Sequence, residues 1–227
     1  MTEPVRAILT DLEGTAMPMS FLTGTLVPFA GERLGSYIAQ HASDSDVEDA
    51  MDEAGRLFGG FTLKQAEAEA LFLRWMKQDR KATPLKVIQG LIWQEGVEAG
   101  QIRSEIYPDV ADSLKSWAAA GLRLFVYSSN SELAQKLLLS HAPAGDLTPL
   151  FEGFFDTVIG QKIEPASYAI ICKKLELPAA SVLVLCDNEE ELDAAKSAGL
   201  STTRIVRNGG VKSRHPVCPD FPSVKLG

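Results

Sequence analysis

Two acidic side chains near the start of the chain are spaced so that they could do chemistry together. Asp11 and Glu13 lie two residues apart, and Gly14 and Thr15 follow directly. Glycine at such a point lets main-chain N–H groups approach a bound anion. Two carboxylates in one pocket can divide their work, one staying ionised as nucleophile or metal ligand while the other exchanges a proton as general acid and base. The alternative is that both side chains only cap a turn, and this pair alone does not decide between them.

Three later positions would complete a site for a phosphate ester. The hydroxyls of Ser128 and Ser129 could bind phosphate oxygens, or could instead cap a helix that starts near residue 131. The ammonium group of Lys162 could neutralise an anionic nucleophile and a phosphate oxygen, whereas a lone lysine in a loop is usually only solvated. Asp187 suits coordination of Mg²⁺ by oxygen atoms, although the acidic run behind it, Glu189–Glu191, also favours the positive end of a helix dipole.

Short apolar runs precede these positions and predict buried strands. Such runs occupy residues 5–10, 122–127 and 181–186, with weaker ones at 154–159 and 201–206. Segments with helical periodicity alternate with them, at residues 109–120, 131–140, 165–175 and 189–198. This alternation predicts an α/β fold, namely a Rossmann-like parallel sheet whose strands are joined by right-handed helical crossovers.

The carboxyl ends of the strands are where ligands bind in such sheets. Four residues fall at or just beyond a predicted strand end, in chain order: Asp11, Ser128, Lys162 and Asp187. Unrelated structural roles would not align them so regularly. A nucleophilic acid, a hydroxyl, a cation and a second acid are the groups needed to transfer a phosphoryl group through an aspartyl-phosphate with Mg²⁺. The expected substrate is a small phosphorylated molecule.

The segment between the first two strands has a different composition. It is rich in Ala, Glu, Leu and Lys and shows no strand-like alternation, which predicts three or four helices. We therefore expect an α/β catalytic core formed by residues 1–20 and 105–227, with residues 21–104 inserted as an all-helical cap domain. The tail from Asn208 to Gly227 is expected to be irregular and partly loose. The three tryptophans are assigned to packing: Trp75, Trp93 and Trp117.

Composition and charge limit the partners and the location that we expect for the protein. Thirty acidic residues against 22 basic ones give the 227-residue chain a net charge of −8, and no basic face for nucleic acid is evident. The three cysteines lack the spacing of a zinc site or a disulfide framework, which favours a reducing compartment. The N-terminus is acidic and no apolar run approaches about 18 residues, so we expect neither a secretion signal nor a membrane partner. A cytoplasmic location fits these features.

The motifs resemble those of the haloacid dehalogenase-like hydrolases, and within them the enolase-phosphatases of methionine salvage. Asp11-Leu12-Glu13-Gly14-Thr15 resembles the opening motif of that family, in which Glu replaces the second Asp usual elsewhere in the superfamily. The resemblance covers about residues 7–207 and includes Thr83-Pro84-Leu85-Lys86, Tyr127-Ser128-Ser129, Gly145-Asp146-Leu147-Thr148-Pro149, and Gly160 with Lys162.

The resemblance implies a Mg²⁺-dependent enzyme, with one ion per subunit, that enolises 2,3-diketo-5-methylthiopentyl-1-phosphate and removes its phosphate to give the acireductone. Asp11 would be the nucleophile and a Mg²⁺ ligand, and Glu13 would bind the ion through its carbonyl and act as general acid and base. Ser128 and Ser129 would bind the substrate phosphate. Lys162 would bind substrate and steady Asp11, while Asp187 would complete the metal site. The helical insertion would close over the substrate, and the enzyme would be a monomer.

Six positions depart from the family pattern. Asn130 stands where the family has Gly, Ala16 and Met17 where it has two Thr, Leu91 where His is usual, and Cys186 and Asn188, on either side of Asp187, where Ser and Val are common. None removes a predicted catalytic group, but Leu91 and Met17 could reshape the substrate pocket, so another small phosphate ester or a phosphosugar stays open as the substrate. A phosphoacceptor signalling module is disfavoured, because its acceptor aspartate would not lie on the first strand and it would have no large helical insertion.

Overall fold

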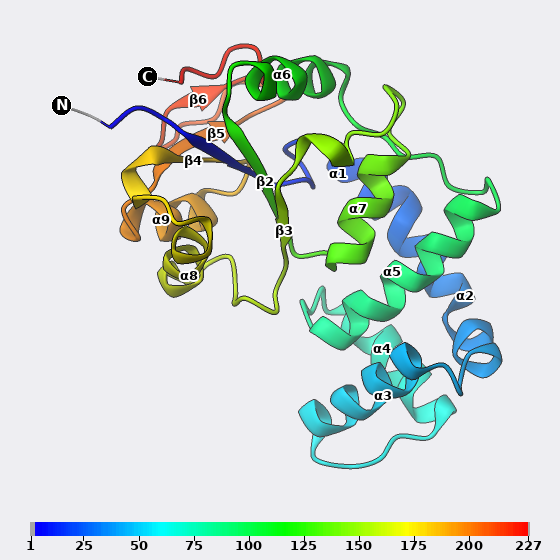
Figure 1. Ribbon diagram of the computed structural model, residues 1–227. Helices are drawn as coiled ribbons and strands as arrows, with labels where there is room; N and C mark the ends of the chain where they lie inside the picture. The colour runs from blue at the N-terminus through cyan, green and yellow to red at the C-terminus, as the bar shows by residue number, and fades with distance from the viewer. Residues whose placement is uncertain (1–2, 227) are drawn as a thin grey trace. The chain divides into compact units, whose positions relative to one another are not determined.

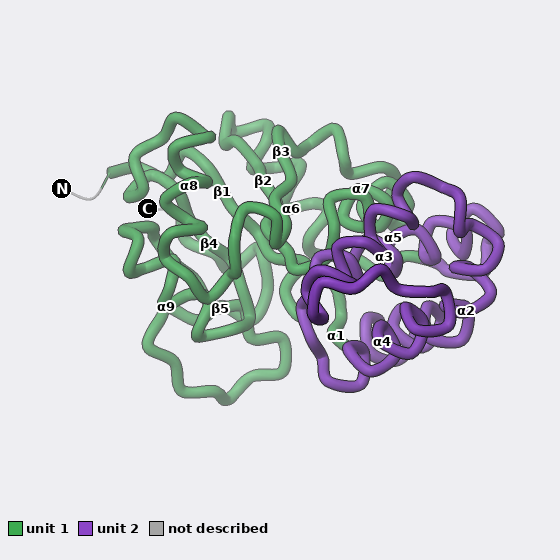
Figure 2. Tube along the Cα trace, turned by 90° about the horizontal axis from the view of Figure 1, so that it is seen from below, with its two compact units in different colours: residues 1–19, 104–227 green, residues 20–103 purple. Residues whose placement is uncertain are grey.

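The computed structural model describes residues 3–226 and falls into two compact units (Figure 2). One unit combines the residues up to Met19 with those from Ser104 onward, and the other is formed by Ser20–Arg103. The first unit is therefore built from two separate stretches of chain, and the second from a single stretch.

The first unit contains a parallel six-stranded sheet in the order β3-β2-β1-β4-β5-β6 (Figure 1). Its strands are β1 (Ala7–Thr10), β2 (Arg123–Tyr127), β3 (Gly153–Phe155), β4 (Val182–Cys186), β5 (Ser201–Ile205) and β6 (Val217–Cys218). The first strand of the chain therefore lies between β2 and β4. All four of its residues are buried, as a strand covered on both faces requires. The predicted parallel sheet is confirmed.

Helices cover both faces of this sheet. They are α6 (Pro108–Ala119), α7 (Glu132–Ser140), α8 (Pro165–Leu175) and α9 (Glu189–Ser197), with short 3₁₀ turns at Thr148–Leu150 and Ala179–Ser181. On one face, alternate strand side chains pack with α8 and α9 in one hydrophobic core, among them Leu9, Tyr127, Val184, Tyr168 and Leu192. On the other face, α6 contacts β2 and α7 contacts β3. The central strands β1, β2 and β4 are therefore buried along almost their whole length.

The strand β3 is shorter than the sequence predicts. The apolar run continues to Ile159, but the strand ends at Phe155. Asp156 ends it, because its carboxylate accepts hydrogen bonds from the main-chain N–H groups of Val158 (2.9 Å) and Glu132 (3.1 Å). Aspartate bonded in this way to an N–H two residues on stabilises a turn instead of a strand. The prediction of a strand over 154–159 is therefore wrong beyond Phe155.

The tail is also more ordered than the sequence predicts. Val217 and Cys218 form the edge strand β6 beside β5, and Phe221 is fully buried with its ring 5.4 Å from that of Trp117. Trp117 itself lies on the buried side of α6. The expectation of a loose end was wrong because Phe221 packs on Trp117, more than 100 positions earlier in the chain, which no local pattern reports.

The second unit is helical. After the single turn α1 (Met19–Phe21), which spans the boundary, come a π-helical turn (Leu22–Leu26) and α2 (Val27–Gln40), α3 (Ser45–Phe58), α4 (Gln65–Lys77) and α5 (Thr83–Glu98). Within this unit α2 packs on α4 and α5, and α3 packs on α5. Trp75 and Trp93 are fully buried, and Trp93 donates to the carbonyl of Leu26 at 2.7 Å, so their assignment to packing is confirmed. Among the described residues, we find no helix with the length and apolar character of a membrane span.

Candidate active site

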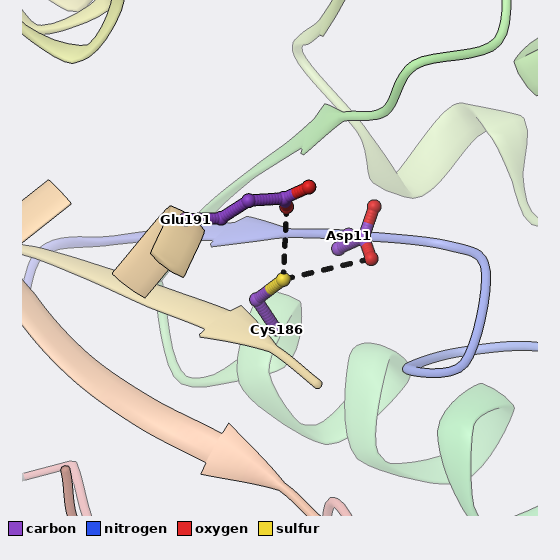
Figure 3. Close-up of side chains that lie close together, drawn as sticks. All are labelled: Asp11, Cys186 and Glu191. Carbon is purple, nitrogen blue, oxygen red and sulfur yellow. Dashed lines mark hydrogen bonds between the residues drawn. The ribbon is translucent and has the colours of Figure 1, made fainter. Parts of the chain in front are cut away.

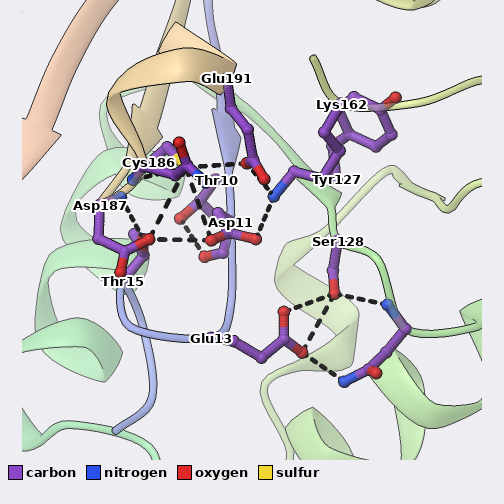
Figure 4. Close-up of polar contacts among 12 residues, drawn as sticks. Thr10, Asp11, Glu13, Thr15, Tyr127, Ser128, Lys162, Cys186, Asp187 and Glu191 are labelled. Atoms are coloured by element: carbon purple, nitrogen blue, oxygen red, sulfur yellow. Dashed lines mark hydrogen bonds and ion pairs between the residues drawn. The ribbon is translucent and has the colours of Figure 1, made fainter. Parts of the chain in front are cut away.

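The carboxyl end of β1 carries the first candidate residue. Thr10 pairs with Val126 of β2 and Leu185 of β4, so Asp11 follows at the level where both neighbouring strands end. Side chains from the loops after β1, β2 and β4 meet at this edge (Figure 4). The site therefore lies where the topology of a parallel sheet predicts a ligand.

Lys162 is a buried cation held between two carboxylates. Its Nζ lies 2.5 Å from Asp11 Oδ1 and 2.7 Å from Glu191 Oε2. The side chains of Lys162 and Asp11 are only 8% and 6% exposed, and that of Glu191 is 17% exposed. Because charges at these distances are shielded from water, this cluster fixes the orientation of Asp11 more firmly than a surface ion pair would.

For both Asp11 and Lys162, burial and the charge of the other residue shift the pKa in opposite directions. Burial raises the pKa of Asp11 well above its usual range, although the Lys162 ammonium opposes this and Glu191 adds to it. Burial alone would lower the pKa of Lys162, but the negative charge of Asp11 and Glu191 raises that pKa above its ordinary value. Burial also raises the pKa of Asp187. The site therefore holds more buried acidic groups than its one cation neutralises.

Hydrogen bonds fix the loop that carries Lys162. Tyr168 on α8 donates its hydroxyl to the Lys162 carbonyl at 2.8 Å, and Tyr127 at the end of β2 donates to the Gly160 carbonyl at 3.0 Å. Gly160 has φ 137°, and a Cβ there would fall on Ser167 Oγ. Ser167 in turn donates to the Gln161 carbonyl at 2.8 Å. Only glycine fits this turn, which brings the lysine into the site.

Glu13 is held separately from Asp11. Ser128 Oγ lies 3.1 and 2.8 Å from its two carboxylate oxygens, and the Asn130 carboxamide donates to one of them. The Ser128 oxygen accepts from the Asn130 main-chain N–H at 3.0 Å, which leaves its own proton for Glu13. Gln135 on α7 fixes this loop by donating to the carbonyls of Asn130 and Phe155, both at 2.8 Å. The Glu13 carboxylate is therefore an acceptor of two donated hydrogen bonds.

The turn after β1 brings Asp187 close to the same region. Thr15 Oγ1 donates to Asp11 Oδ2 at 3.4 Å and accepts from the Asp187 main-chain N–H at 2.9 Å. Gly14 has φ 78°, and a Cβ on it would overlap the Asp187 carboxylate. The Asp187 side chain is thus packed directly against the backbone of the turn that carries Glu13.

Two sets of ligand atoms could receive a metal ion. One is Asp11, Cys186 and Glu191, whose ligand atoms all lie within 4.8 Å of one another (Figure 3). This set includes a thiol, which suits softer ions than Mg²⁺, and both of its carboxylates are already paired with Lys162. The other set is Asp11, Asp187 and the carbonyl of Glu13, all of them oxygen donors. The buried Asp11 and the half-buried Asp187 repel each other here, which fits a divalent cation, so the second set suits Mg²⁺ better.

The structure places most of the predicted site residues together. Asp11 contacts Lys162, Ser128 contacts Glu13, and Asp187 lies against Gly14. The helix that follows Ser129 is capped by Ser131, whose Oγ accepts from Ala134 N at 3.4 Å, so the alternative of Ser128 or Ser129 as the cap is wrong. Ser129 is partly buried in the same loop.

Sequence reasoning missed two groups in this site. The sequence predicts for Glu191 only a place in an acidic run at a helix start, yet its carboxylate contacts Lys162, while Glu189 of the same run accepts from Ser213. For Asn130 the sequence indicates only a departure from the family, yet its carboxamide donates to Glu13. A signal for Glu191 existed in its place four residues after Asp187, but the sequence did not indicate which of three glutamates turns inward.

Comparison with known proteins decides the family. A model of the haloacid dehalogenase-like hydrolases matches residues 5–199. An enolase-phosphatase E1 of Xanthobacter autotrophicus is 59% identical over 223 residues, which cover 98% of this chain and 99% of the relative. The chain belongs to the enolase-phosphatase E1 family. The enolase-phosphatase E1 of Methylococcus capsulatus is 45% identical over 97% of this chain and 98% of its own.

Solved structures place the fold in the same group. The UTR4 protein of Saccharomyces cerevisiae matches with a TM-score of 0.76 and 32% identity, covering 97% of this chain and 100% of that one. Membership of the enolase-phosphatase E1 family makes this chain a hydrolase, and haloacid dehalogenase-like hydrolases generally use Mg²⁺.

Proposed function

We propose that this protein is an enolase-phosphatase that enolises 2,3-diketo-5-methylthiopentyl-1-phosphate and then removes its phosphate to give the acireductone of methionine salvage. The observation that carries the proposal is that two carboxylates on one turn are held by different partners. Asp11 is paired with Lys162, whereas Glu13 is held by Ser128 and Asn130. Family membership suggests the substrate, and the site holds groups that suit the transfer of its phosphoryl group.

Asp11 is the proposed nucleophile. Its carboxylate attacks phosphorus, a new P–O bond forms to Asp11, and the bond from phosphorus to the substrate oxygen breaks. Lys162 holds Asp11 Oδ1 at 2.5 Å, whereas the other oxygen, Oδ2, has among the described residues only the long 3.4 Å contact from Thr15 and the thiol of Cys186 at 3.7 Å. The ammonium of Lys162 also offsets negative charge on the phosphoryl group as it is transferred.

Glu13 is the proposed general acid and base. It gives a proton to the departing substrate oxygen, and later takes one from the water that attacks the phosphorus of the aspartyl-phosphate. The hydrogen bonds from Ser128 and Asn130 orient the carboxylate for both transfers. Ser128 and Ser129 are also proposed to bind the substrate phosphate, so Ser128 would link the phosphate to the group that moves the proton.

Asp11, Asp187 and the Glu13 carbonyl would hold one Mg²⁺. When bound, the ion offsets the repulsion between the Asp11 carboxylate and the substrate phosphate. The raised pKa values of Asp11 and Asp187 fit this assignment, because both acids lie in a region that favours added positive charge.

The helical unit is proposed to serve as the cap that excludes water from the reaction. We further propose that the enzyme works as a cytoplasmic monomer. All three cysteines, Cys172, Cys186 and Cys218, are free thiols, which suits a reducing compartment. Size-exclusion chromatography with light scattering should give the chain mass of 24.6 kDa.

One assay tests the proposed reaction. Phosphate release from the diketone phosphate is followed in the same cuvette as the ultraviolet absorbance of the acireductone, with Mg²⁺ and with EDTA. Both products should appear together with Mg²⁺, and neither with EDTA. Cleavage of a generic aryl phosphate without turnover of the diketone phosphate would show instead that the substrate is another phosphate ester. In that case the buried Met17 and the half-buried Leu91 are the positions to exchange.

A further inference from the structure

Arg207, just after β5, connects three parts of the first unit. Its Nη1 lies 2.7 and 2.8 Å from the two carboxylate oxygens of Asp109, and its Nε and Nη2 donate to the Thr15 carbonyl at 3.2 and 2.8 Å. The guanidinium also lies 4.1 Å from the centre of the Tyr107 ring. Its side chain is only 11% exposed. An arginine fork that binds a carboxylate and a carbonyl together fixes both in direction as well as distance.

Thr15 is the residue through which this contact reaches the site. It is fully buried, and its hydroxyl bonds Asp11 Oδ2 on one side and the Asp187 main-chain N–H on the other. Arg207 therefore holds the carbonyl of the residue that joins the nucleophile to the second acid. In the part of the chain that the structure describes, Arg207 forms no hydrogen bond or ion pair with either acid, so any effect it has on them passes through Thr15.

The C-terminal segment in turn holds the partner of Arg207. The main-chain N–H of Phe221 donates to Asp109 Oδ2 at 3.0 Å, and the fully buried Phe221 ring lies 5.4 Å from the Arg207 guanidinium. Phe221 follows the edge strand β6, which pairs with β5. The tail thus completes a chain of contacts from Phe221 through Asp109 and Arg207 to Thr15.

We propose that Arg207 is a positioning residue for the reaction and that the C-terminal segment keeps it in place. The contact with the Thr15 carbonyl fixes the turn after β1, and the turn fixes Asp11 relative to Asp187. This inference rests on the proposed function, because it assigns to Arg207 the alignment of the proposed nucleophile and metal ligands. Loss of the contact therefore lowers the rate of the chemical step and the affinity for Mg²⁺, while binding of the organic part of the substrate changes little.

The test compares Arg207→Ala with a matched variant, Arg123→Ala. Arg123 also pairs with a carboxylate (Glu152, 2.7 Å), donates to a carbonyl (Leu175, 2.8 Å) and lies over a ring (Phe125, 5.2 Å), but it sits at the opposite, amino end of β2. Arg207→Ala should lower kcat by about 10- to 100-fold with KM changed less than about threefold. Arg123→Ala should lose a similar amount of thermal stability and keep its kcat.

Two further measurements make the result decisive. Arg207→Lys keeps the charge but cannot bond Asp109 and Thr15 with one planar fork, so its kcat should fall between those of wild type and Arg207→Ala. Mg²⁺ titration calorimetry, which needs no turnover, should show weaker binding in Arg207→Ala and unchanged binding in Arg123→Ala. Equal losses of kcat and unchanged Mg²⁺ affinity in both alanine variants would overturn the inference. An inactive wild type that binds Mg²⁺ with this pattern would instead count against the proposed reaction alone.

Discussion

Lys162 shows how a single side chain sets the charge of the site. It is one buried cation between two carboxylates, in a region where burial and neighbouring acids also raise the pKa of Asp187. Removing one partner of a buried ionic cluster lowers the free energy of unfolding by more than the whole cluster adds to it. The reason is that the remaining charges stay buried without a partner of opposite sign. We therefore expect the lysine to stabilise the site as well as to serve the proposed reaction.

Lys162→Met should destabilise the protein and stop turnover. We expect the free energy of unfolding at neutral pH to fall by about 3–5 kcal/mol, because Asp11 and Glu191 are left facing each other without a cation. Urea unfolding measures this loss. The double variant Lys162→Met with Glu191→Gln should regain part of the stability while staying inactive. If the double variant were no more stable than the single one, repulsion between the carboxylates would not be the cause.

Asp11→Asn should abolish phosphate release and keep the fold. The amide has the shape of the carboxylate but is not an effective nucleophile, so kcat should fall by at least about 1,000-fold. Circular dichroism serves as the control for folding. Phosphate release from a well-folded Asp11→Asn protein at a rate near that of wild type would show that another group attacks phosphorus.

The predicted site residues could be found in the sequence because each follows a strand, and strands leave an apolar signal. Asp11 and Asp187 stand directly after buried runs, so their meeting follows from sheet topology. Glu191 and Asn130 could not be found this way. Their roles depend on which side chain of a helix turn or loop points inward, and that direction is set by packing rather than by spacing.

At the scale of elements, the turn after β1 depends on glycine. Gly14 combines φ 78° with a position where a Cβ would overlap Asp187. Gly121, in the turn between α6 and β2, has φ 83° with open space around it. Substitutions at these two glycines therefore allow the effect of backbone strain, which both share, to be distinguished from crowding against Asp187, which only Gly14 has.

Gly14→Ala should damage activity, whereas Gly121→Ala should cost only stability. Each substitution places a side chain at positive φ, which costs about 1–2 kcal/mol in unfolding free energy. Only Gly14→Ala also displaces the Asp187 carboxylate, so we expect its kcat to fall by about 100-fold or more. Thermal unfolding and steady-state kinetics on both variants give the comparison. Equal kcat values would mean that Asp187 can move without consequence.

The helical unit carries its own pH dependence. Tyr37 on α2 stacks on His41 with ring centres 4.3 Å apart, and burial, with Glu95 and nearby aspartates adding to it, raises the pKa of Tyr37 to about 12. An unfolded tyrosine has a pKa of about 10. The folded state thus favours the neutral phenol, and this contribution to stability is present below pH 10 and is lost as the pH rises through 12.

Tyr37→Phe should flatten the alkaline side of the stability curve. Between pH 10 and 12 the unfolding free energy of wild type should fall more steeply than that of the variant, because the phenylalanine has no proton to lose. Chemical unfolding at several pH values gives both slopes. Other tyrosines with raised pKa values, such as Tyr127 and Tyr168, are common to both proteins and cancel in the difference. Parallel curves would contradict the prediction.

The elements themselves differ in how far sequence could predict them. Strands β1, β2 and β4 are continuous apolar runs and were placed to within about two residues. The end of β3 could not be predicted from the sequence, because Asp156 forms a turn inside an apolar stretch. The strand β6 gave no signal, because it is only two residues long and Trp117, on which the following Phe221 packs, lies far back in the chain.

For the whole molecule, binding of Mg²⁺ should appear as added stability. An ion that binds only the folded protein stabilises it by about 2.7 kcal/mol when its concentration is 100 times the dissociation constant. The thermal midpoint should therefore rise with Mg²⁺ and fall with EDTA. Asp187→Asn should lose most of this response, because the amide replaces a charged ligand. A response of wild-type size in Asp187→Asn would move the metal site to other residues.

The central place of β1 has a consequence for how the protein is made. Ala7 pairs with Arg123 on one side and with Val182 on the other, so the second partner is synthesised 182 − 7 = 175 residues later. At about 5–20 residues per second, the first strand waits roughly 10 to 35 s on the ribosome before its sheet can close. During that time the contiguous segment Ser20–Arg103 has all of its own partners. The first strand is therefore made early but gains its second partner late, and Asp11 can meet Asp187 only after β4 has been made.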